Sequence, residues 1–110
     1  MKQGEIWELF LGPIKGSEQG GRRLALIISG NAINDNLNIV IVCPLTSKIK
    51  EFKGNLIINP SAKNGLKKVS EVLTFHIRSV AKERLKNKLG NIPLKDIESI
   101  KKTLGDLLKY

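Results

Sequence analysis

The sequence LALIIS at residues 24–29 and the sequence IVIVC at residues 39–43 contain the two longest uninterrupted apolar runs of the chain. Both are rich in aliphatic and β-branched side chains, and turn-forming residues bound them, with Gly30-Asn31 after the first and Pro44 after the second. Short apolar runs between turn residues are typical of strands buried on both faces. We therefore predict two central strands, the second of which ends at Pro44.

Weaker strand patterns surround these two runs. Residues 5–11 begin by alternating charged with large apolar side chains, which is the period of a half-buried strand, and Gly12-Pro13 ends the pattern. Shorter apolar segments follow at residues 54–58, 71–75 and 76–80. Short strands separated by turn signals predict a small β-barrel, so the fold class is mainly β.

Two helical patterns occur late in the chain. Residues 81–85 predict about one helical turn. After Pro93, which suits a first helical position, apolar residues recur at helical spacing at Ile97, Ile100, Leu104, Leu107 and Leu108. Gly105 costs this helix about 1 kcal/mol relative to alanine, so its last turn needs a packing partner or frays. The sequence thus predicts a C-terminal amphipathic helix appended to the barrel.

The length and the charge limit the possible classes of protein. We expect residues 1–110 to form a single domain with a modest hydrophobic core. The formal net charge is +9, and residues 1–47 carry as many acidic as basic side chains, so the whole excess lies in residues 48–110. This surface would attract polyanions, although a lysine-rich face that only favours solubility has the same pattern.

Several other classes are excluded. The apolar runs fall far short of the roughly 18 residues that span a bilayer, and the first residues lack the apolar core of a secretory signal. We expect a cytoplasmic protein that does not enter a membrane. A single cysteine, Cys43, forbids an internal disulfide and is expected to be a buried thiol, while one cysteine and one histidine do not suit a zinc site.

A glycine-rich loop is the first candidate site. Residues 16–23, GSEQGGRR, lead directly into the first central strand. Glycines let a backbone approach a ligand, Ser17, Glu18 and Gln19 offer hydrogen bonds, and the core would hold an arginine at the strand entrance. A phosphate site and a flexible hairpin loop with solvated arginines fit this pattern equally well.

Two further segments carry polar side chains next to predicted strands. The hydroxyls of Thr46 and Ser47 follow the second central strand and could donate to a phosphate, although threonines at strand ends are common. Strand alternation would place His76 and Arg78 on one face, where the imidazole could accept or donate a proton near neutral pH. A partly buried structural histidine is the alternative.

These segments together resemble the MazF/PemK (Kid) family of toxin endoribonucleases from type II toxin–antitoxin pairs. Members typically begin with Gly-Glu/Asp-Ile-Trp, here residues 4–7, and continue with Gly-Ser-Glu-Gln-x-Gly-x-Arg-Pro, here residues 16–24, and Pro-x-Thr-Ser, here residues 44–47. The likeness extends to residue 85. It implies an SH3-like barrel of the MazF/PemK/CcdB type, a homodimer, and sequence-specific cleavage of single-stranded RNA without metal or cofactor.

The resemblance also implies roles for individual residues. The family's catalytic arginine and threonine fall on Arg23 and Thr46, and His76 stands where the family usually has glutamine. Residues that help to line the family's RNA site fall on Ser17, Glu18 and Gln19. From their places beside the predicted strands, we expect Ser47 and Arg78 to bind RNA as well. A carboxylate used by the Kid branch is replaced by Phe75, so the resemblance leaves the general base unassigned.

Such a site would use the RNA's own 2′-hydroxyl as nucleophile. Arg23 and Thr46 would stabilise the negative charge that develops on the phosphorus, which yields a 2′,3′-cyclic phosphate and a 5′-hydroxyl end. Arginine is a poor proton carrier, so His76 is the candidate general base or acid.

Partners and rival functions complete the prediction. The resemblance implies an antitoxin whose acidic, disordered tail occupies the basic groove.

A gyrase-poisoning toxin of the same fold is disfavoured because that family ends in Trp-Gly-Ile, whereas this sequence ends Leu108-Lys109-Tyr110. A basic barrel that binds RNA without cutting it is the third possibility. It would need exposed stacking aromatics, and we expect Trp7, Phe10 and Phe75 to lie in the core.

Overall fold

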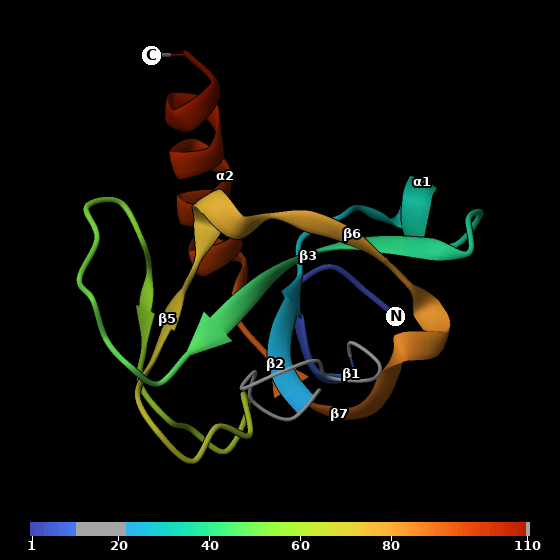
Figure 1. Cartoon of the computed structure of the whole chain (residues 1–110), viewed down its shortest axis with the longest axis horizontal. Coiled ribbons are helices and arrows are strands. Elements are labelled where there is room, and N and C mark those ends of the chain that lie inside the picture. Colours follow the sequence, from blue (N-terminus) through green and yellow to red (C-terminus); the bar gives the residue numbers. More distant parts are fainter. Residues whose placement is uncertain (11–21, 110) are drawn as a thin grey trace, which may run out of the picture.

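A computed structural model describes residues 1–10 and 22–109 of the chain (Figure 1). These described residues form seven strands, two α-helices and two short 3-10 helices. In chain order they are β1 (Glu5–Phe10), β2 (Arg22–Ile27), α1 (Asn31–Asn34), β3 (Ile39–Thr46), β4 (Ile57–Ile58), β5 (Ser70–Val72), η1 (Thr74–His76), β6 (Arg78–Ala81), η2 (Lys82–Arg84), β7 (Leu85–Asn91) and α2 (Leu94–Lys109).

The strands form one curled antiparallel sheet in the order β4-β5-β3-β2-β1-β7, with β6 also paired to β3. Strand β3 is its centre, because β2 pairs along one edge while β6 and then β5 pair along the other. Figure 1 shows the sheet wrapping on itself with α2 alongside. The predicted mainly β fold with an appended C-terminal helix is confirmed.

Side chains of β2 and β3 alternate between two buried clusters. Leu26 and Cys43 contribute to the first cluster, which α2 covers with Ile97 and Ile100. Ala25, Ile27, Val40 and Val42 contribute to the second cluster, which lies on the other face. The two apolar runs are therefore the central, doubly buried strands that the sequence predicts. Burial raises the pKa of the Cys43 thiol to about 12, as expected for an inert core cysteine.

The sequence predicted that the second central strand ends at Pro44. In the structure, β3 continues to Thr46. Pro44 lies where the outer edge of β3 changes its partner from β6, which pairs up to Val42, to β5, which pairs from Leu45. The carbonyl of Pro44 still accepts a 2.9 Å hydrogen bond from the Leu73 N–H. Pro44 has no N–H to donate, but it lies between the two sets of paired residues. The missing hydrogen bond therefore costs the sheet little stability.

The weaker predictions were partly wrong. Of the predicted strand over residues 54–58, only Ile57–Ile58 is paired. The predicted strand over residues 71–75 is Ser70–Val72, and η1 follows it instead of a continuous strand. The helical turn predicted at residues 81–85 is the 3-10 helix η2. The sequence did not predict α1 or β7. Strand β7 reads LKNKLGN, with few apolar residues, because it is a terminal strand of the sheet order.

Two aromatic side chains lie elsewhere than predicted. Phe10 is 40% exposed and Phe75 is 46% exposed, so neither belongs to the core. Trp7 packs on the second cluster as predicted, and its Nε1 donates a 2.9 Å hydrogen bond to Glu5 Oε1. The chain thus presents exposed aromatic rings that its sequence pattern assigned to the interior.

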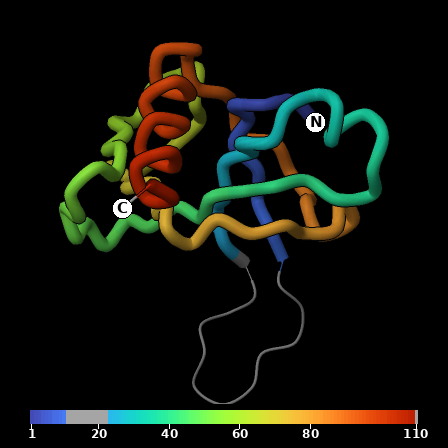
Figure 2. Tube along the Cα trace, turned by 90° about the horizontal axis from the view of Figure 1, so that it is seen from above, coloured from blue at the N-terminus to red at the C-terminus, as the bar shows by residue number. Residues whose placement is uncertain are grey.

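Helix α2 packs on its own barrel for half of its length. Ile97 and Ile100 are buried and Leu104 is partly buried against the first cluster, whereas Leu107 and Leu108 are 49% and 90% exposed. Figure 2 shows α2 at one end of the barrel and α1 at the other. Across the described ranges, 1–10 and 22–109, no helix is both long and apolar enough to cross a membrane.

One glycine brings the segment before β5 against β7. Gly65 has a φ of 70°, and a Cβ built on it would lie 2.2 Å from the carbonyl oxygen of Leu89. Any other residue would strain this backbone and clash with the neighbouring strand. Leu66, the next residue, and Leu89 both pack in the first cluster, and both line the groove described next.

Candidate functional site

The register of β2 on β3 brings Arg23 towards Thr46. Leu26 pairs with Cys43 and Ala25 pairs with Pro44, where the pairing ends; the same register continued by two residues would set Arg23 opposite Thr46. Side chains that face each other on adjacent antiparallel strands have Cβ atoms about 5 Å apart. Arg23 is exposed and Thr46 is half-buried, so the guanidinium can reach a ligand above a hydroxyl that the sheet holds in place.

Both residues line an open groove of about 850 Å³. Among the described residues that line it, the apolar ones are Leu24, Leu45, Leu66 and Leu89, and the cationic ones are Arg23, Lys48, Lys67, Lys68 and Lys88. Its remaining polar side chains are Glu8, Thr46, Ser47, Ser70 and Asn87. Five cations and one carboxylate among the described lining residues give the groove a positive potential, which attracts a polyanion.

The Thr46 hydroxyl is oriented by its own strand end. Thr46 Oγ1 accepts a 3.1 Å hydrogen bond from the Lys48 N–H. A hydroxyl has one donor hydrogen and two acceptor positions, so this bond uses an acceptor position and leaves the hydrogen available to a ligand. Ser47, the next residue, is exposed and lines the same groove.

A fully buried carboxylate, Glu71, pairs with Thr46 across β3 and β5. Glu71 Oε1 accepts hydrogen bonds from the N–H groups of Lys50 and Glu51 at 2.7 and 2.9 Å. Glu71 Oε2 accepts bonds from the Phe52 N–H at 3.1 Å and from Asn55 Nδ2 at 2.9 Å. Burial alone would raise its pKa, but these four donors outweigh burial and hold the pKa of Glu71 below its usual range.

Glu71 thereby holds the segment of residues 48–55 beside the groove. From the far side, Thr103 Oγ1 of α2 donates a 2.7 Å bond to the Gly54 carbonyl. Sequence reasoning missed Glu71. The available signal was a charged residue at the first position of the strand predicted over residues 71–75, and such a residue is rarely buried without several partners.

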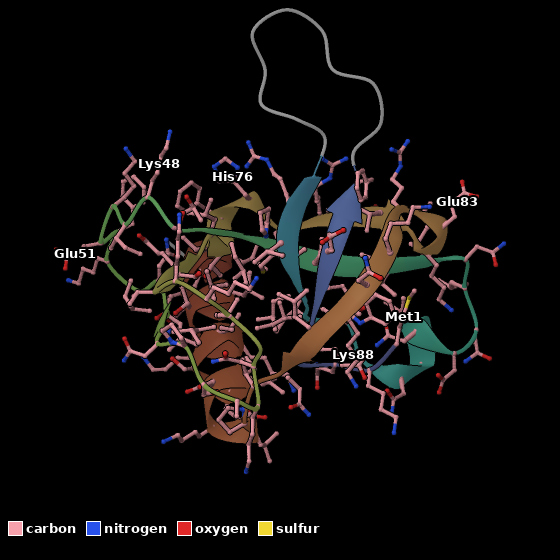
Figure 3. All side chains as sticks on the ribbon, turned by 90° about the horizontal axis from the view of Figure 1, so that it is seen from below. Met1, Lys48, Glu51, His76, Glu83 and Lys88 are labelled. Carbon is pink, nitrogen blue, oxygen red and sulfur yellow. The ribbon has the colours of Figure 1, made fainter. Side chains whose placement is uncertain are left out.

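Strand alternation predicted that His76 and Arg78 share one face of a strand. This prediction is wrong. His76 belongs to η1 and Arg78 begins β6, and both are exposed. The imidazole of His76 lies against the Phe75 ring, with ring centroids 4.6 Å apart, and Phe75 meets Phe52 edge-on at 5.3 Å. Neither residue is among the described residues that line the groove. Figure 3 shows His76 and Lys48 on the side of the molecule where β1 ends and β2 begins.

Three of the predicted RNA-binding residues belong to the glycine-rich segment of residues 16–23. Ser17, Glu18 and Gln19 lie outside the described residues. Within the ranges 1–10 and 22–109, no three His, Cys, Asp or Glu side chains are grouped so that they could hold a metal ion.

Glu8 is a second acidic residue that sequence reasoning missed. It is 7% exposed, lies on β1 between Leu24 of β2 and Asn87 of β7, and lines the groove. Asn87 Nδ2 donates to Glu8 Oε1 at 3.3 Å. Its charged position in an alternating strand was visible in the sequence, but the pattern could not show that this face forms the lining of a groove.

The comparisons with known proteins agree with this architecture. A family model described as PemK-like, MazF-like toxin of type II toxin-antitoxin system matches residues 2–108. The chain is 34% identical over 101 residues to Endoribonuclease MazF of Staphylococcus saprophyticus subsp. saprophyticus, which covers 91% of this chain and 84% of the relative. It is 28% identical over 109 residues to Endoribonuclease MazF9 of Mycobacterium tuberculosis, covering 94% and 92%. A crystal structure of MazE-MazF from Deinococcus radiodurans matches with a TM-score of 0.80 and 30% identity, covering 99% of this chain and 96% of that chain.

Proposed function

Because the chain belongs to the PemK-like, MazF-like toxins of type II toxin–antitoxin systems, we propose that Arg23 and Thr46 form the centre at which it cleaves single-stranded RNA. The protein is an endoribonuclease toxin, like its relatives. The groove carries the assignment of the centre, because Arg23 of β2 and Thr46 of the neighbouring strand β3 both line it together with several lysines.

The chemistry follows from the RNA and from these two side chains. The 2′-hydroxyl attacks the adjacent phosphorus, and the bond to the 5′ oxygen of the next nucleotide breaks. Negative charge grows on the phosphoryl oxygens during this step, and the forked guanidinium of Arg23 can donate two hydrogen bonds to them. The Thr46 hydroxyl hydrogen supplies a third donor. Lys48, Lys67 and Lys68 would bind the flanking phosphates.

The proposed chemistry predicts its products. Purified protein incubated with a mixed-sequence RNA in excess EDTA is expected to cleave it, leaving 2′,3′-cyclic phosphate and 5′-hydroxyl ends. The 5′ ends should accept label from polynucleotide kinase without prior phosphatase treatment, because they carry no phosphate. Intact RNA in EDTA, or products with 5′-phosphates, would contradict the proposal.

We assign His76 to proton transfer during the reaction. Its exposed imidazole lies on the same side of the molecule as Lys48, and contact with Phe75 restrains its ring (Figure 3). The groove lining does not include His76, so this role requires the bound RNA to bring the scissile phosphate within hydrogen-bond reach of the imidazole.

The substitution His76→Gln tests this role. It is expected to lower the cleavage rate about 10²-fold, since glutamine makes hydrogen bonds but does not transfer a proton. Single-turnover rates provide the measurement. Full activity of His76→Gln would exclude His76 from catalysis.

The partners that we propose are an antitoxin and a second copy of the chain. The similar Deinococcus radiodurans structure is a MazE-MazF complex, and the cationic groove suits an acidic antitoxin segment for the same reason that it suits RNA. Leu107 and Leu108 leave an apolar surface at the end of α2, which favours contact with another chain. We propose one toxin domain over residues 1–110 that acts on mRNA in the cytoplasm.

A further inference from the structure

We propose that the exposed rings of Phe52 and Phe75 form a platform beside the groove on which an unpaired base of the RNA stacks. The inference rests on the proposed function, because it takes single-stranded RNA as the ligand of the groove. It assigns a task to two aromatic side chains that the cleavage chemistry does not use.

Both rings are open to solvent although they belong to large apolar side chains. Phe52 is 49% exposed and Phe75 is 46% exposed. Their ring centroids lie 5.3 Å apart with the ring planes at 84°, and the imidazole of His76 lies 4.6 Å from the Phe75 ring. Edge-to-face contacts of this kind support the rings without covering them. The pair therefore offers flat aromatic surface to which a base can bind.

Hydrogen bonds fix the two rings relative to each other. The Phe52 N–H donates to Glu71 Oε2 at 3.1 Å. Asn55 Nδ2 donates to the same oxygen at 2.9 Å, and Asn55 Oδ1 accepts a 3.4 Å bond from the Thr74 N–H. Asn55 thus ties the segment of residues 48–55, which carries Phe52, to η1, which carries Phe75. A surface that is already ordered loses little conformational entropy when a ligand binds.

The charges around the rings favour RNA as the occupant. The segment that carries Phe52 also carries three exposed cations, Lys48, Lys50 and Lys53, and Arg78 lies exposed at the start of β6. Glu51 is the one acid of this segment, and Figure 3 shows it at the outer edge of the molecule. A second copy of the chain docked symmetrically on the rings would bring like charges together. Cations that hold phosphates around rings that hold a base suit a single nucleic-acid strand.

The platform is continuous with the groove. Lys48 lines the groove and belongs to the same segment as Phe52, so an RNA strand bound in the groove can continue onto the rings. A base stacked on Phe75 would also bring the strand to His76, whose imidazole contacts that ring. Stacking uses the face of a base and not its edge, so we expect the platform to accept every base and to bind purines more tightly than pyrimidines.

Binding of RNA that cannot be cut tests the platform apart from cleavage. The probes are a fully 2′-O-methylated adenosine nonamer and an abasic nonamer with the same number of phosphates, and the readout is fluorescence anisotropy. Phe52→Leu keeps an apolar side chain but removes the aromatic face, and it is expected to weaken binding of the adenosine nonamer about tenfold. Binding of the abasic nonamer should not change, because this probe has no base to stack.

Two further variants serve as controls. Phe52→Tyr keeps the ring and is expected to bind both nonamers as the wild type does. Leu37→Ala truncates an apolar side chain that is 48% exposed, close to the exposure of Phe52, but that follows α1, at the opposite end of the barrel from α2 (Figure 2). This variant should also bind both nonamers normally. Thermal unfolding checks that each variant folds.

The outcomes separate this proposal from the proposed function. The platform is overturned, even if RNA is cleaved in EDTA, by a wild-type protein that binds the two nonamers alike or by Phe52→Leu with unchanged affinity for the adenosine nonamer. It is also overturned if Phe52→Leu weakens both nonamers equally. Loss of self-association in Phe52→Leu, with base-dependent affinity retained, would assign the rings to a second copy of the chain instead. A loss confined to Phe52→Leu and the adenosine nonamer supports the platform even if the cleavage assay fails.

Discussion

Arg23→Ala is expected to lower the single-turnover rate of RNA cleavage in EDTA about 10³-fold while the protein remains folded. Removal of one preorganised donor to a developing negative charge typically costs 10² to 10³ in rate, and Arg23 supplies a pair of donors together with a full charge. Arg23 is exposed at the start of β2, so its truncation removes little packing from the core. The loss should therefore appear in the rate and not in the thermal midpoint.

Two further variants distinguish the geometry of Arg23 from its charge. Arg23→Lys keeps the charge but loses the planar fork, and is expected to recover only a small part of the lost rate. Lys102→Ala removes one positive charge from α2, where Lys102 pairs with Asp106 at 3.7 Å outside the groove lining, and is expected to retain nearly full activity. Cleavage undiminished in Arg23→Ala, or equally reduced in Lys102→Ala, would overturn the assignment of the centre.

Glu71→Gln is expected to produce the largest loss of stability, about 2–4 kcal/mol in the free energy of unfolding at neutral pH. Its carboxylate accepts four hydrogen bonds, three of them from consecutive backbone N–H groups of residues 50–52. A glutamine amide keeps one acceptor oxygen but turns an NH₂ group towards donors, which leaves buried N–H groups without an acceptor. For a domain of this size the thermal midpoint should fall by roughly 10 °C.

The effect of Glu71→Gln should depend on pH in a defined direction. The pKa of Glu71 is lowered in the folded state, so its stabilisation is complete above the usual pKa of 4.5 and is lost as the pH falls through the lowered value. The difference in stability between wild type and Glu71→Gln is therefore expected to be constant near pH 7 and to shrink below about pH 4. Urea unfolding at several pH values measures it.

The variant Glu5→Gln is the control for Glu71→Gln. The pKa of Glu5 is also lowered, because bonds from Trp7, the Lys2 N–H and Lys88 outweigh the effect of burial. Glu5→Gln should lose stability without changing cleavage, whereas Glu71→Gln should also weaken RNA binding, since it releases the segment that carries Lys48 and Lys50. Equal stability of wild type and Glu71→Gln from pH 3 to 7 would contradict the role of this carboxylate.

The parts of the fold that were predictable are those that follow from local patterns. Residues 24–29 and 39–43 are apolar enough to be buried whatever their partners, and the helical spacing after Pro93 identifies α2. Arg23 and Thr46 could also be selected as candidates, since each adjoins one of the two central strands. These predictions depend on neighbours within a few residues of each other in the chain.

The parts that were missed depend on pairing between distant segments. Strand β7 is polar and forms because β1 offers it a free edge, and β3 continues through Pro44 because its outer edge changes partner there. Glu71 is buried because backbone N–H groups some 20 residues away converge on it. Phe75, expected in the core, is exposed because the chain forms η1 where a strand was predicted.

By itself the sequence determined the two central strands, the C-terminal helix, the surplus of positive charge and the likeness to a toxin family. The tertiary structure decided that Arg23, Thr46 and Glu8 line one groove and that Glu71 holds the adjoining segment. The physical reason is that hydrophobic periodicity is a local property of the chain. The register of one strand on another is set by contacts between residues far apart in sequence, and that register assembles the site.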